Sequence, residues 1–324
     1  MSQARHKGKR LKPLIYVDGA AGTTGLEIRE RLAGRDDVAI RVLSDMDRKD
    51  IAVRTAALNE ADIAVLCLPD EAAREAVALV ENPSVRILDA SSAHRTAAGW
   101  IYGFSELEPG RRREIAAAHR VSNPGCYATA FLALVRPLVR AGLIPADSPI
   151  TATGLSGYSG GGRTMIEEFE HSNSPRFTSS VVRTYALNLA HKHVPEMRAH
   201  AGLVHPPVFA PTVGRFYRGM MVEVPLQLWS FPENRTARDA HTVLASEYAG
   251  SAQIEVAPFG EVPATIDAEM LKNTDRMALF VFGNATTRQA RLIAVLDNLG
   301  KGAAGAAVQN LNIMLGVPDS TGLH

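Results

Sequence analysis

The chain has 324 residues, a hydrophobic fraction of 46% and a formal net charge of +1 at pH 7. This length is enough for two hydrophobic cores, and the near-neutral charge argues against nucleic acid or an anionic membrane as the main partner. No apolar run reaches the roughly 18 residues of a membrane-spanning helix, and two cysteines cannot build a disulfide framework, so we expect a cytoplasmic protein.

The N-terminal part of the chain alternates short apolar runs with helical patterns. The basic start 1–13 has no apolar segment behind it, so we interpret it as a solvated tail and not as a secretory signal. Residues 14–35 are typical of a buried strand, a glycine turn and a helix, and further strands are expected within 38–50, 56–82 and 85–95. This alternation predicts a parallel sheet with crossover helices, as in a Rossmann-like, doubly wound α/β domain.

The pattern changes after Cys126. Residues 150–162 are typical of a strand that enters a glycine-rich loop. Longer strands with few helices between them are expected in four segments: 205–229, 252–260, 276–284 and 290–298. We therefore predict a second, α+β domain with a largely antiparallel sheet. Residues 300–316 form a helix rich in glycine and alanine, which would allow close packing against another element.

Three glycines, Gly19, Gly22 and Gly25, lie between the first strand and the first helix. A tight turn there would bring the backbone close to a ligand and direct the first helical N–H groups at a phosphate. The spacing differs from the usual dinucleotide motif, so the pattern alone is weak and the context of strand, turn and helix carries the interpretation. The alternative is a purely structural turn.

The end of the second strand bears on the choice between NAD and NADP. Ser44 and Arg48, a hydroxyl and a nearby cation, suit the 2′-phosphate of NADP, whereas Asp45 would repel it if turned inward. We expect NADP as the cofactor. Pro69 and Ser91, in the loops after the third and fourth strands, are further candidates for cofactor binding.

Cys126 follows a Pro-Gly turn and precedes a long apolar run. At a helix N-terminus, unpaired N–H groups and the helix dipole favour a thiolate, so we predict a lowered pKa and a nucleophile. Cys67 lies inside an apolar strand, where cysteine usually behaves as a small hydrophobic residue. A thiolate beside a nicotinamide indicates acyl chemistry, in which a thioester is reduced by hydride to an aldehyde.

Such chemistry needs an acid/base near neutral pH, which histidine supplies most simply. Among ten histidines, the densest cluster is His191 and His193. On a helix, side chains two residues apart point in different directions, so at most one should face the sulfur. Pro195 is expected to end the helix near Val194 and leave His193 at its end. No set of residues has the spacing of metal ligands.

Six motifs carry a resemblance to a known family: GAAGTTG, LDASSAHR, SNPGCYAT, GYSGGGR, HKHVPEM and LDNLGKGAAGAAVQNLNIMLG. Together they resemble N-acetyl-gamma-glutamyl-phosphate reductase in its shorter-chain form, a family related to aspartate-semialdehyde dehydrogenase. The resemblance runs from about 14 to about 318. It implies an enzyme of arginine biosynthesis that reduces N-acetyl-L-glutamyl 5-phosphate with NADPH to the 5-semialdehyde and releases phosphate.

The resemblance also implies roles for individual residues. Cys126 matches the nucleophile and His193 the acid/base, with His191 left open as the alternative. Arg95 matches an arginine that holds the acyl-phosphate, since a guanidinium can bind phosphate through two hydrogen bonds. The cofactor turn is matched by Gly19, Gly22, Thr23, Thr24 and Gly25. Further candidates for substrate binding are Asn123, Ser156, Arg163 and His191. Ser156, Ser159 and Arg163 could equally cap the helix that follows them.

The family's C-terminal helix returns to the nucleotide domain. The resemblance therefore implies an NADP-binding domain of residues 1–122 and 300–324 and a catalytic domain of residues 123–299. It also implies a homo-oligomer, a dimer or a tetramer. Two alternatives stay open: a reductase for the aspartyl substrate, and a non-catalytic redox sensor in which Cys67 would pair with Cys126.

Overall fold

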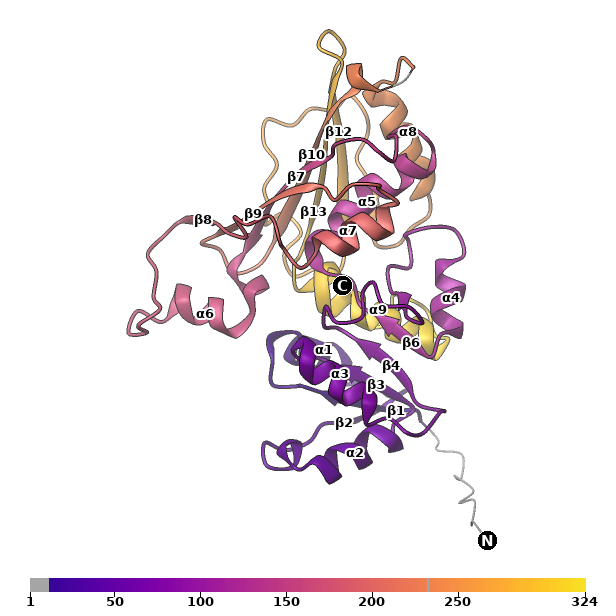
Figure 1. Ribbon diagram of the computed structural model, residues 1–324, viewed down its shortest axis with the longest axis vertical. Helices are drawn as coiled ribbons and strands as arrows, with labels where there is room; N and C mark the ends of the chain where they lie inside the picture. The colour runs from indigo at the N-terminus through magenta and orange to yellow at the C-terminus, as the bar shows by residue number, and fades with distance from the viewer. Residues whose placement is uncertain (1–11, 232) are drawn as a thin grey trace.

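A computed structural model describes residues 12–231 and 233–324, so the predicted basic tail falls largely outside the described residues. Two sheets follow one another along the longest axis of the molecule, and the C-terminal helix lies at their junction (Figure 1). Within the described ranges, no helix has both the length and the apolar character needed to cross a membrane.

The first sheet is parallel throughout, in the order β2-β1-β3-β4-β6-β5. Its strands are β1 (Leu14–Asp18), β2 (Ala39–Arg41), β3 (Ile63–Leu66), β4 (Arg86–Asp89), β5 (Ile101–Tyr102) and β6 (Arg120–Ser122). The helices between them are α1 (Thr23–Leu32), α2 (Ile51–Glu60), α3 (Asp70–Ala78) and α4 (Arg111–Ala117), with the short turn η1 (Asp47–Lys49). Strands β1 and β3 are buried along their whole length, as helices on both faces require. The predicted Rossmann-like fold is confirmed.

The C-terminal segment packs against this first sheet. It consists of a π-helical turn, η4 (Gly300–Ala304), followed by α9 (Gly305–Leu315). Ala304, Ala307 and Val308 share a core with Ile15 and Val17 of β1. The predicted close packing is also confirmed, since a Cβ atom on Gly302 would lie 2.9 Å from the Cβ of Cys126. These glycines let the segment pass directly beside the cysteine.

The second sheet is mixed, in the order β11-β12-β13-β10-β7-β9-β8. Its strands are β7 (Thr151–Gly157), β8 (Val182–Thr184), β9 (Val208–Gly214), β10 (Met220–Gln227), β11 (Ile254–Val256), β12 (Met277–Asn284) and β13 (Gln289–Leu296). Four of its strand pairs are antiparallel and two are parallel. A largely antiparallel sheet in an α+β domain was therefore the right expectation.

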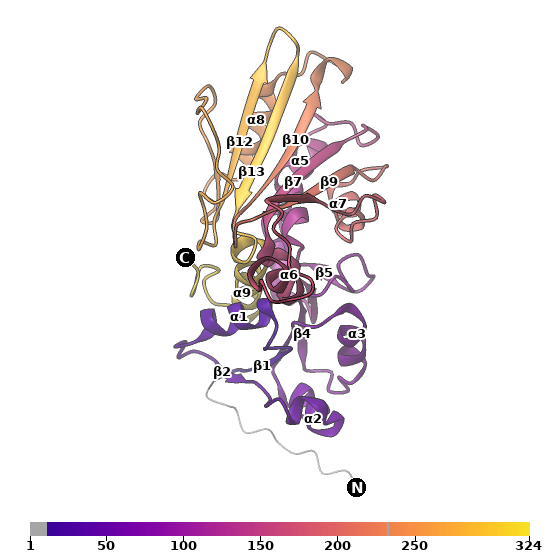
Figure 2. The same ribbon diagram turned by 90° about the vertical axis from the view of Figure 1, so that its left-hand side faces the viewer.

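Helices cover one face of this sheet, and the sheet is seen nearly edge-on in Figure 1 with α5, α7 and α8 on the same side. The helices of this domain are α5 (Cys126–Arg140), α6 (Gly162–Glu170), α7 (Val194–Ala201) and α8 (Ala237–Glu247), with the short turns η2 (Tyr158–Gly161) and η3 (Leu228–Ser230). Helix α5 is central, because its apolar run from Tyr127 to Leu138 lies in the largest hydrophobic core. Figure 2 shows the long strands β10, β12 and β13 in front of α5 and α8.

Two details of the predicted second domain were wrong. The segment 205–229 forms two strands, because the chain turns between Gly214 and Met220 and β9 pairs parallel with β7. Helix α8 was not predicted, although Thr236 and Asp239 form a capping box at its start. The threonine and the aspartate three residues later could have indicated this helix start from the sequence.

Candidate active site

The glycine turn after β1 is sterically obligatory. Gly19 has φ of +81°, and a Cβ atom there would collide with the carbonyl oxygen of Cys67. A Cβ atom on Gly25 would lie 2.5 Å from the carbonyl oxygen of Gly19. Helix α1 starts after Gly22 with no side-chain cap and no acidic residue in its first turn. The start of α1 therefore suits the pyrophosphate of a dinucleotide.

The polar residues that follow β2 form hydrogen bonds and ion pairs among themselves. The hydroxyl of Ser44 donates to Asp47 at 2.8 Å, and Arg48 pairs with Asp45 at 3.1 Å. Asp45 does not turn inward, since its side chain is 85% exposed. A cavity of about 90 Å³ between this region and the glycine turn is lined by Gly19, Arg29, Asp45 and Arg48. This cavity lies where an adenosine ribose would be expected.

The other two cofactor candidates are tied into the backbone framework. Pro69 precedes α3 at its N-cap position. The hydroxyl of Ser91 donates to Asp89 at 2.7 Å and accepts from the backbone N–H of Ala93. Neither side chain lines the cavity at the cysteine.

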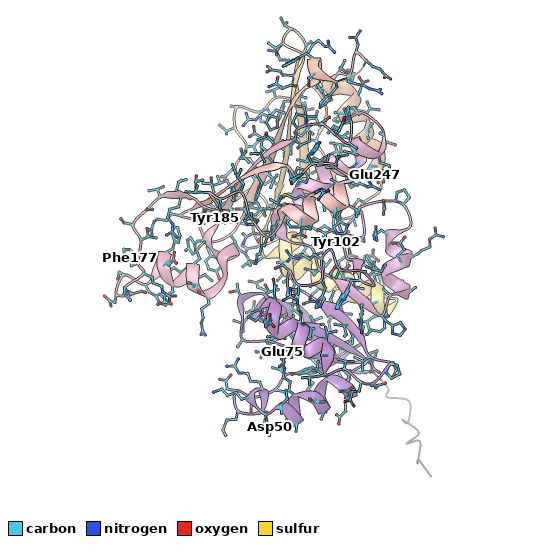
Figure 3. The ribbon with its side chains drawn as sticks, viewed as in Figure 1. Asp50, Glu75, Tyr102, Phe177, Tyr185 and Glu247 are labelled. Carbon is cyan, nitrogen blue, oxygen red and sulfur yellow. The ribbon has the colours of Figure 1, made fainter. Side chains whose placement is uncertain are left out.

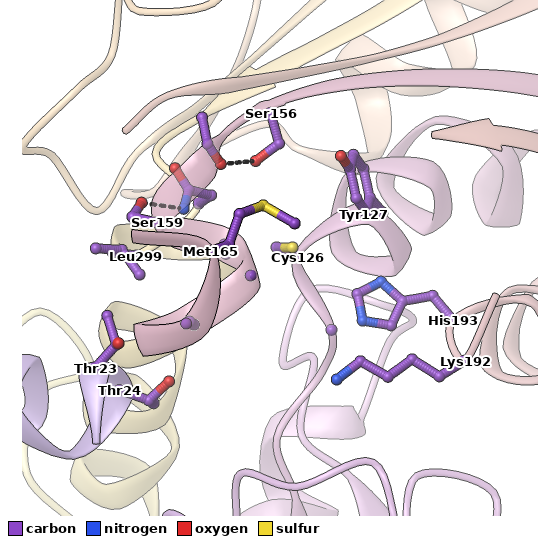
Figure 4. A pocket seen from close by; sticks show the side chains of 18 of the residues that line it. Thr23, Thr24, Cys126, Tyr127, Ser156, Ser159, Met165, Lys192, His193 and Leu299 are labelled. Atoms are coloured by element: carbon purple, nitrogen blue, oxygen red, sulfur yellow. Dashed lines mark hydrogen bonds between the residues drawn. The ribbon is translucent and has the colours of Figure 1, made fainter. Parts of the chain in front are cut away.

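Cys126 is the first residue of α5, and Gly125 is its N-cap. A cavity of about 280 Å³ opens beside it, between the two sheets. Figure 4 shows the sulfur of Cys126 between Met165 and the ring of His193. Eight of the predicted site residues line this cavity: Thr23, Thr24, Arg95, Asn123, Cys126, Ser156, His191 and His193. The cysteine is thus brought together with the cofactor turn and the histidines.

The prediction that the pKa of the Cys126 thiol is lowered was wrong. Burial raises the pKa of Cys126, although Arg95, the backbone N–H of Tyr127 and Lys192 all act to lower it. Cys126 does lie at a helix start, as predicted. The desolvation of its thiolate nevertheless raises the pKa by more than the helix start and the nearby cations lower it. Cys67 differs in kind: burial raises its pKa to about 12, and its side chain is outside the cavity at Cys126.

The histidine pair lies before a helix and not at its end. Helix α7 begins at Val194, with His193 as N-cap and Pro195 in the first turn. The prediction that Pro195 ends a helix was wrong, because proline is also well tolerated in a first turn, where its missing N–H would be unpaired. Both rings line the cavity, with their centroids 4.6 Å apart. This is possible because the two residues are not inside a helix, where side chains two positions apart would point in different directions.

The protonation of these histidines follows from their burial. Burial, with Lys192 and Arg95 nearby, lowers the pKa of His191 to about 4. Burial together with Arg95 and His191 takes the pKa of His193 well below its ordinary value. The Nδ1 atom of His193 has no hydrogen-bond partner among the described residues. His193 is therefore a neutral base at pH 7 whose ring nitrogens form no hydrogen bond within the described residues.

Arg95 is buried and already engaged. Its guanidinium pairs with Glu196 at 2.8 Å and donates to the carbonyl oxygen of Asn123 at 3.0 Å. Asn123 in turn donates from its side chain to the carbonyl oxygen of Ala303 at 3.0 Å. Both residues thus fix the walls of the cavity by internal contacts.

The glycine-rich loop after β7 contributes one wall. Ser156 donates to the carbonyl oxygen of Gly157, and Ser159 accepts from Asn298 at 2.8 Å. Helix α6 has no side-chain cap, so the capping alternative for these serines and Arg163 was wrong. Arg163 is exposed and lines a separate cavity between α1 and α6.

Several residues of the site were not predicted. Glu196 and Lys192 lie within the histidine motif itself, and Tyr127 follows the cysteine. Lys192 and Tyr127 line the cavity together with Met165, Tyr185 and Asn298. A signal existed for Glu196: it stands three residues after His193, a spacing that places both on one face once the helix start is known.

The comparisons with known proteins agree with this geometry. Two family models match: the semialdehyde dehydrogenase NAD binding domain over residues 15–116 and the semialdehyde dehydrogenase dimerisation domain over residues 126–298. N-acetyl-gamma-glutamyl-phosphate reductase 2 of Nostoc sp. is 50% identical over 96% of this chain and 99% of its own length. The chain belongs to the N-acetyl-gamma-glutamyl-phosphate reductases. The reductase of Burkholderia ambifaria is likewise 50% identical, over 94% of this chain and 97% of its own.

Solved structures place this reductase in a wider fold family. Aspartate semialdehyde dehydrogenase II of Vibrio cholerae superposes with a TM-score of 0.71, over 94% of this chain and 98% of its own, at 16% identity. Aspartate semialdehyde dehydrogenase of Candida albicans, solved with NADP, gives a TM-score of 0.64, over 94% of this chain and 98% of its own, at 13% identity. At such identities the likeness establishes the shared fold.

The lowered pKa of His191 makes the stability of the reductase depend on pH. Between pH 6.5, the ordinary pKa, and pH 4, the unfolded chain binds a proton at His191 that the folded chain does not. Stability is therefore lost as the pH falls through this window. Between pH 7 and pH 5, we expect wild type to lose about 1–2 kcal/mol more than His191→Gln in urea unfolding. Equal losses would contradict the lowered pKa.

Proposed function

We propose that the chain reduces N-acetyl-L-glutamyl 5-phosphate with NADPH to N-acetyl-L-glutamate 5-semialdehyde and phosphate, in arginine biosynthesis. The observation that carries this function is the cavity that joins Cys126 and His193 to Thr23 and Thr24 of the glycine turn. The names of relatives at about 50% identity support the substrate. The aspartyl alternative rests on solved structures such as the one at 16% identity. A likeness at such low identity shows the fold and not the substrate.

The cysteine and the histidine divide the acyl transfer between them. His193 takes the proton of the Cys126 thiol, and the sulfur attacks the acyl carbon. The bond between that carbon and the phosphate oxygen breaks, and His193 passes its proton to the departing phosphate. The product of this half-reaction is a thioester on Cys126. Since burial raises the pKa of the thiol, removal of its proton by a neutral histidine is the step that makes it nucleophilic.

The glycine turn suits the cofactor, because Gly19 and Gly25 let the backbone turn tightly between β1 and α1 and α1 begins uncapped. Gly19, Gly22, Thr23, Thr24 and Gly25 would hold the pyrophosphate. When bound, NADPH supplies the hydride that reduces the thioester. The Cys126 sulfur then leaves as the aldehyde forms, and takes a proton to regain the thiol.

The other cofactor candidates are assigned to the remaining parts of NADP. Arg48 lines the cavity beyond the glycine turn, where the 2′-phosphate would reach, and Ser44 follows Leu43, which also lines it. Pro69 and Ser91 lie in the loops after β3 and β4, at the same edge of the sheet as the glycine turn.

The substrate is anionic, and the cavity offers one unpaired cation. Lys192 lines it and forms no ion pair within the described part of the chain, whereas Arg95 is held by Glu196. Figure 4 shows Lys192 extending beside His193. We assign Lys192 to an anionic group of the substrate, with Arg95, Asn123, Ser156 and His191 forming the walls around it.

The remaining parts of the proposal concern organisation. The packing of α9 on the parallel sheet supports an NADP-binding domain of residues 1–122 and 300–324, with residues 123–299 as the catalytic domain. The matched dimerisation domain supports a homo-oligomer. A cytoplasmic location fits an enzyme that needs a reduced thiol.

The substrate is tested most directly in the aldehyde-oxidising direction, with NADP⁺ and inorganic phosphate. We expect turnover of N-acetylglutamate semialdehyde and, under the same conditions, little turnover of aspartate semialdehyde. The two aldehydes differ by one methylene and an acetyl group, and a pocket built for one should discriminate by about 10-fold or more. Preference for aspartate semialdehyde would replace this function with the aspartyl alternative.

The nucleophile is tested by Cys126→Ser. We expect turnover to fall by at least about 10³-fold, because a serine hydroxyl is a far weaker nucleophile, while NADPH affinity measured by fluorescence stays the same. Intact-mass analysis without NADPH should show an acyl adduct on wild type and on Cys67→Ser, but not on Cys126→Ser. An adduct that maps elsewhere would remove Cys126 from this role.

The assignment of Lys192 is tested by Lys192→Met. We expect the KM for the acyl-phosphate to rise about 10-fold with little change in kcat, because a charge-assisted hydrogen bond is lost. The matched control is Lys272→Met, since Lys272 is an exposed lysine paired with Glu269 and outside the cavity. Equal KM values for the two variants would exclude the role of Lys192.

A further inference from the structure

Glu196 is a buried carboxylate that no ligand in the proposed reaction touches. It lies in the first turn of α7, and only 1% of its surface is exposed. A carboxylate so far from water is costly unless its oxygens are paired. Two of its partners come from the first domain: Arg95 after β4 and Tyr102 of β5, each donating at 2.8 Å. Figure 3 shows Tyr102 where the two sheets meet.

The other two partners of Glu196 are next to the reacting cysteine. The backbone N–H of Gly125, the residue before Cys126, donates to Glu196 Oε2 at 3.2 Å. The Nε2 atom of His193 lies 3.9 Å from Glu196 Oε1. A Cβ atom on Gly125 would collide with Arg95, His193 and Glu196 at once. One carboxylate thus binds the buried cation and the start of α5, with the base 3.9 Å away.

We propose that Glu196 is a positioning residue of this reductase, which orients His193 through Nε2 and fixes Arg95 beside Cys126. The inference rests on the proposed roles of Cys126 and His193. The Nε2 atom lies 3.9 Å from the carboxylate, and neither ring nitrogen of His193 is hydrogen-bonded within the described residues, so the ring is free to take the thiol proton. Glu196 would then be the third group in a chain from nucleophile to base to carboxylate.

A second buried pair in the same protein shows what a structural carboxylate looks like. Glu106 is paired with Lys301 at 2.7 Å and accepts from Gln309 at 2.9 Å. This cluster lies away from the sulfur, and neither Glu106 nor Lys301 lines the cavity at Cys126. Glu106→Gln is therefore a matched control for the loss of a buried, paired carboxylate.

The charges around Cys126 make two effects of Glu196 separable. The groups that face the thiol are Arg95, Tyr127, Tyr185, His191, Lys192, His193 and Glu196. Glu196 acts to raise the pKa of the thiol, and Arg95 acts to lower it. Removing the carboxylate should favour the thiolate while it releases His193. Alkylation, which needs only the thiolate, should then become faster while turnover becomes slower.

The test compares Glu196→Gln with wild type and Glu106→Gln. We expect kcat of Glu196→Gln to fall on the order of 10²-fold with KM little changed, because a misplaced base loses its share of catalysis. Its pH profile of Cys126 alkylation by iodoacetamide should move to lower pH. Glu106→Gln should leave that profile in place. NADPH-binding stoichiometry confirms that each variant is folded in the assay.

The outcomes distinguish a positioning role of Glu196 from a structural one. A kcat of Glu196→Gln no lower than that of Glu106→Gln overturns the proposal, as does an unmoved alkylation profile. If Glu196→Gln does not fold, Glu196→Asp replaces it: a reduced kcat with an unmoved profile supports the proposal, and wild-type kcat overturns it. Wild type without activity on the acyl-phosphate would instead contradict the proposed function, which keeps the two failures distinguishable.

Discussion

The contact between the start of α5 and the π-helical turn η4 is the constraint on which the site depends. Gly302 leaves the space that Cys126 occupies, and the side chain of Asn123 donates to the carbonyl oxygen of Ala303. Asn310 of α9 donates to Asn123 at 3.0 Å, so the segment before the cysteine is held along its length. Segments almost 180 residues apart thereby fix the sulfur at the junction of the two sheets, between the cofactor turn and the histidines.

The electrostatics of the cavity follow from burial more than from any single charge. Desolvation raises the pKa of Cys126 and lowers that of His193, so both groups are neutral at rest. Proton transfer from the thiol to the imidazole creates two charges that burial disfavours, and the groups that lower the pKa of the thiol, Arg95 and Lys192 among them, offset part of this cost. The buried pair of Arg95 and Glu196 adds order without net charge, and Lys192 is left to meet an anionic substrate.

The sequence predicted the features that depend on local chemistry. The glycine turn, the cysteine at a helix start and the small residues of α9 each require a particular residue type at one place, so the pattern in its local context indicates them. It failed where a residue type allows two structures, as with Pro195, which can end a helix or open one. It also missed Glu196 and its ion pair with Arg95, because a pairing between distant segments is visible only after folding.

The chain passes between the two sheets at two places, 123–125 after β6 and 297–299 after β13. Asn123, Pro124 and Gly125 from the first crossing and Asn298 and Leu299 from the second all line the cavity at Cys126. The sheets are joined by packing as well, since Tyr102 and Phe104 of the first domain lie in the core of the second. Cys126 directly follows the first crossing and lies beside the second, so both backbone connections between the sheets fix the position of its sulfur.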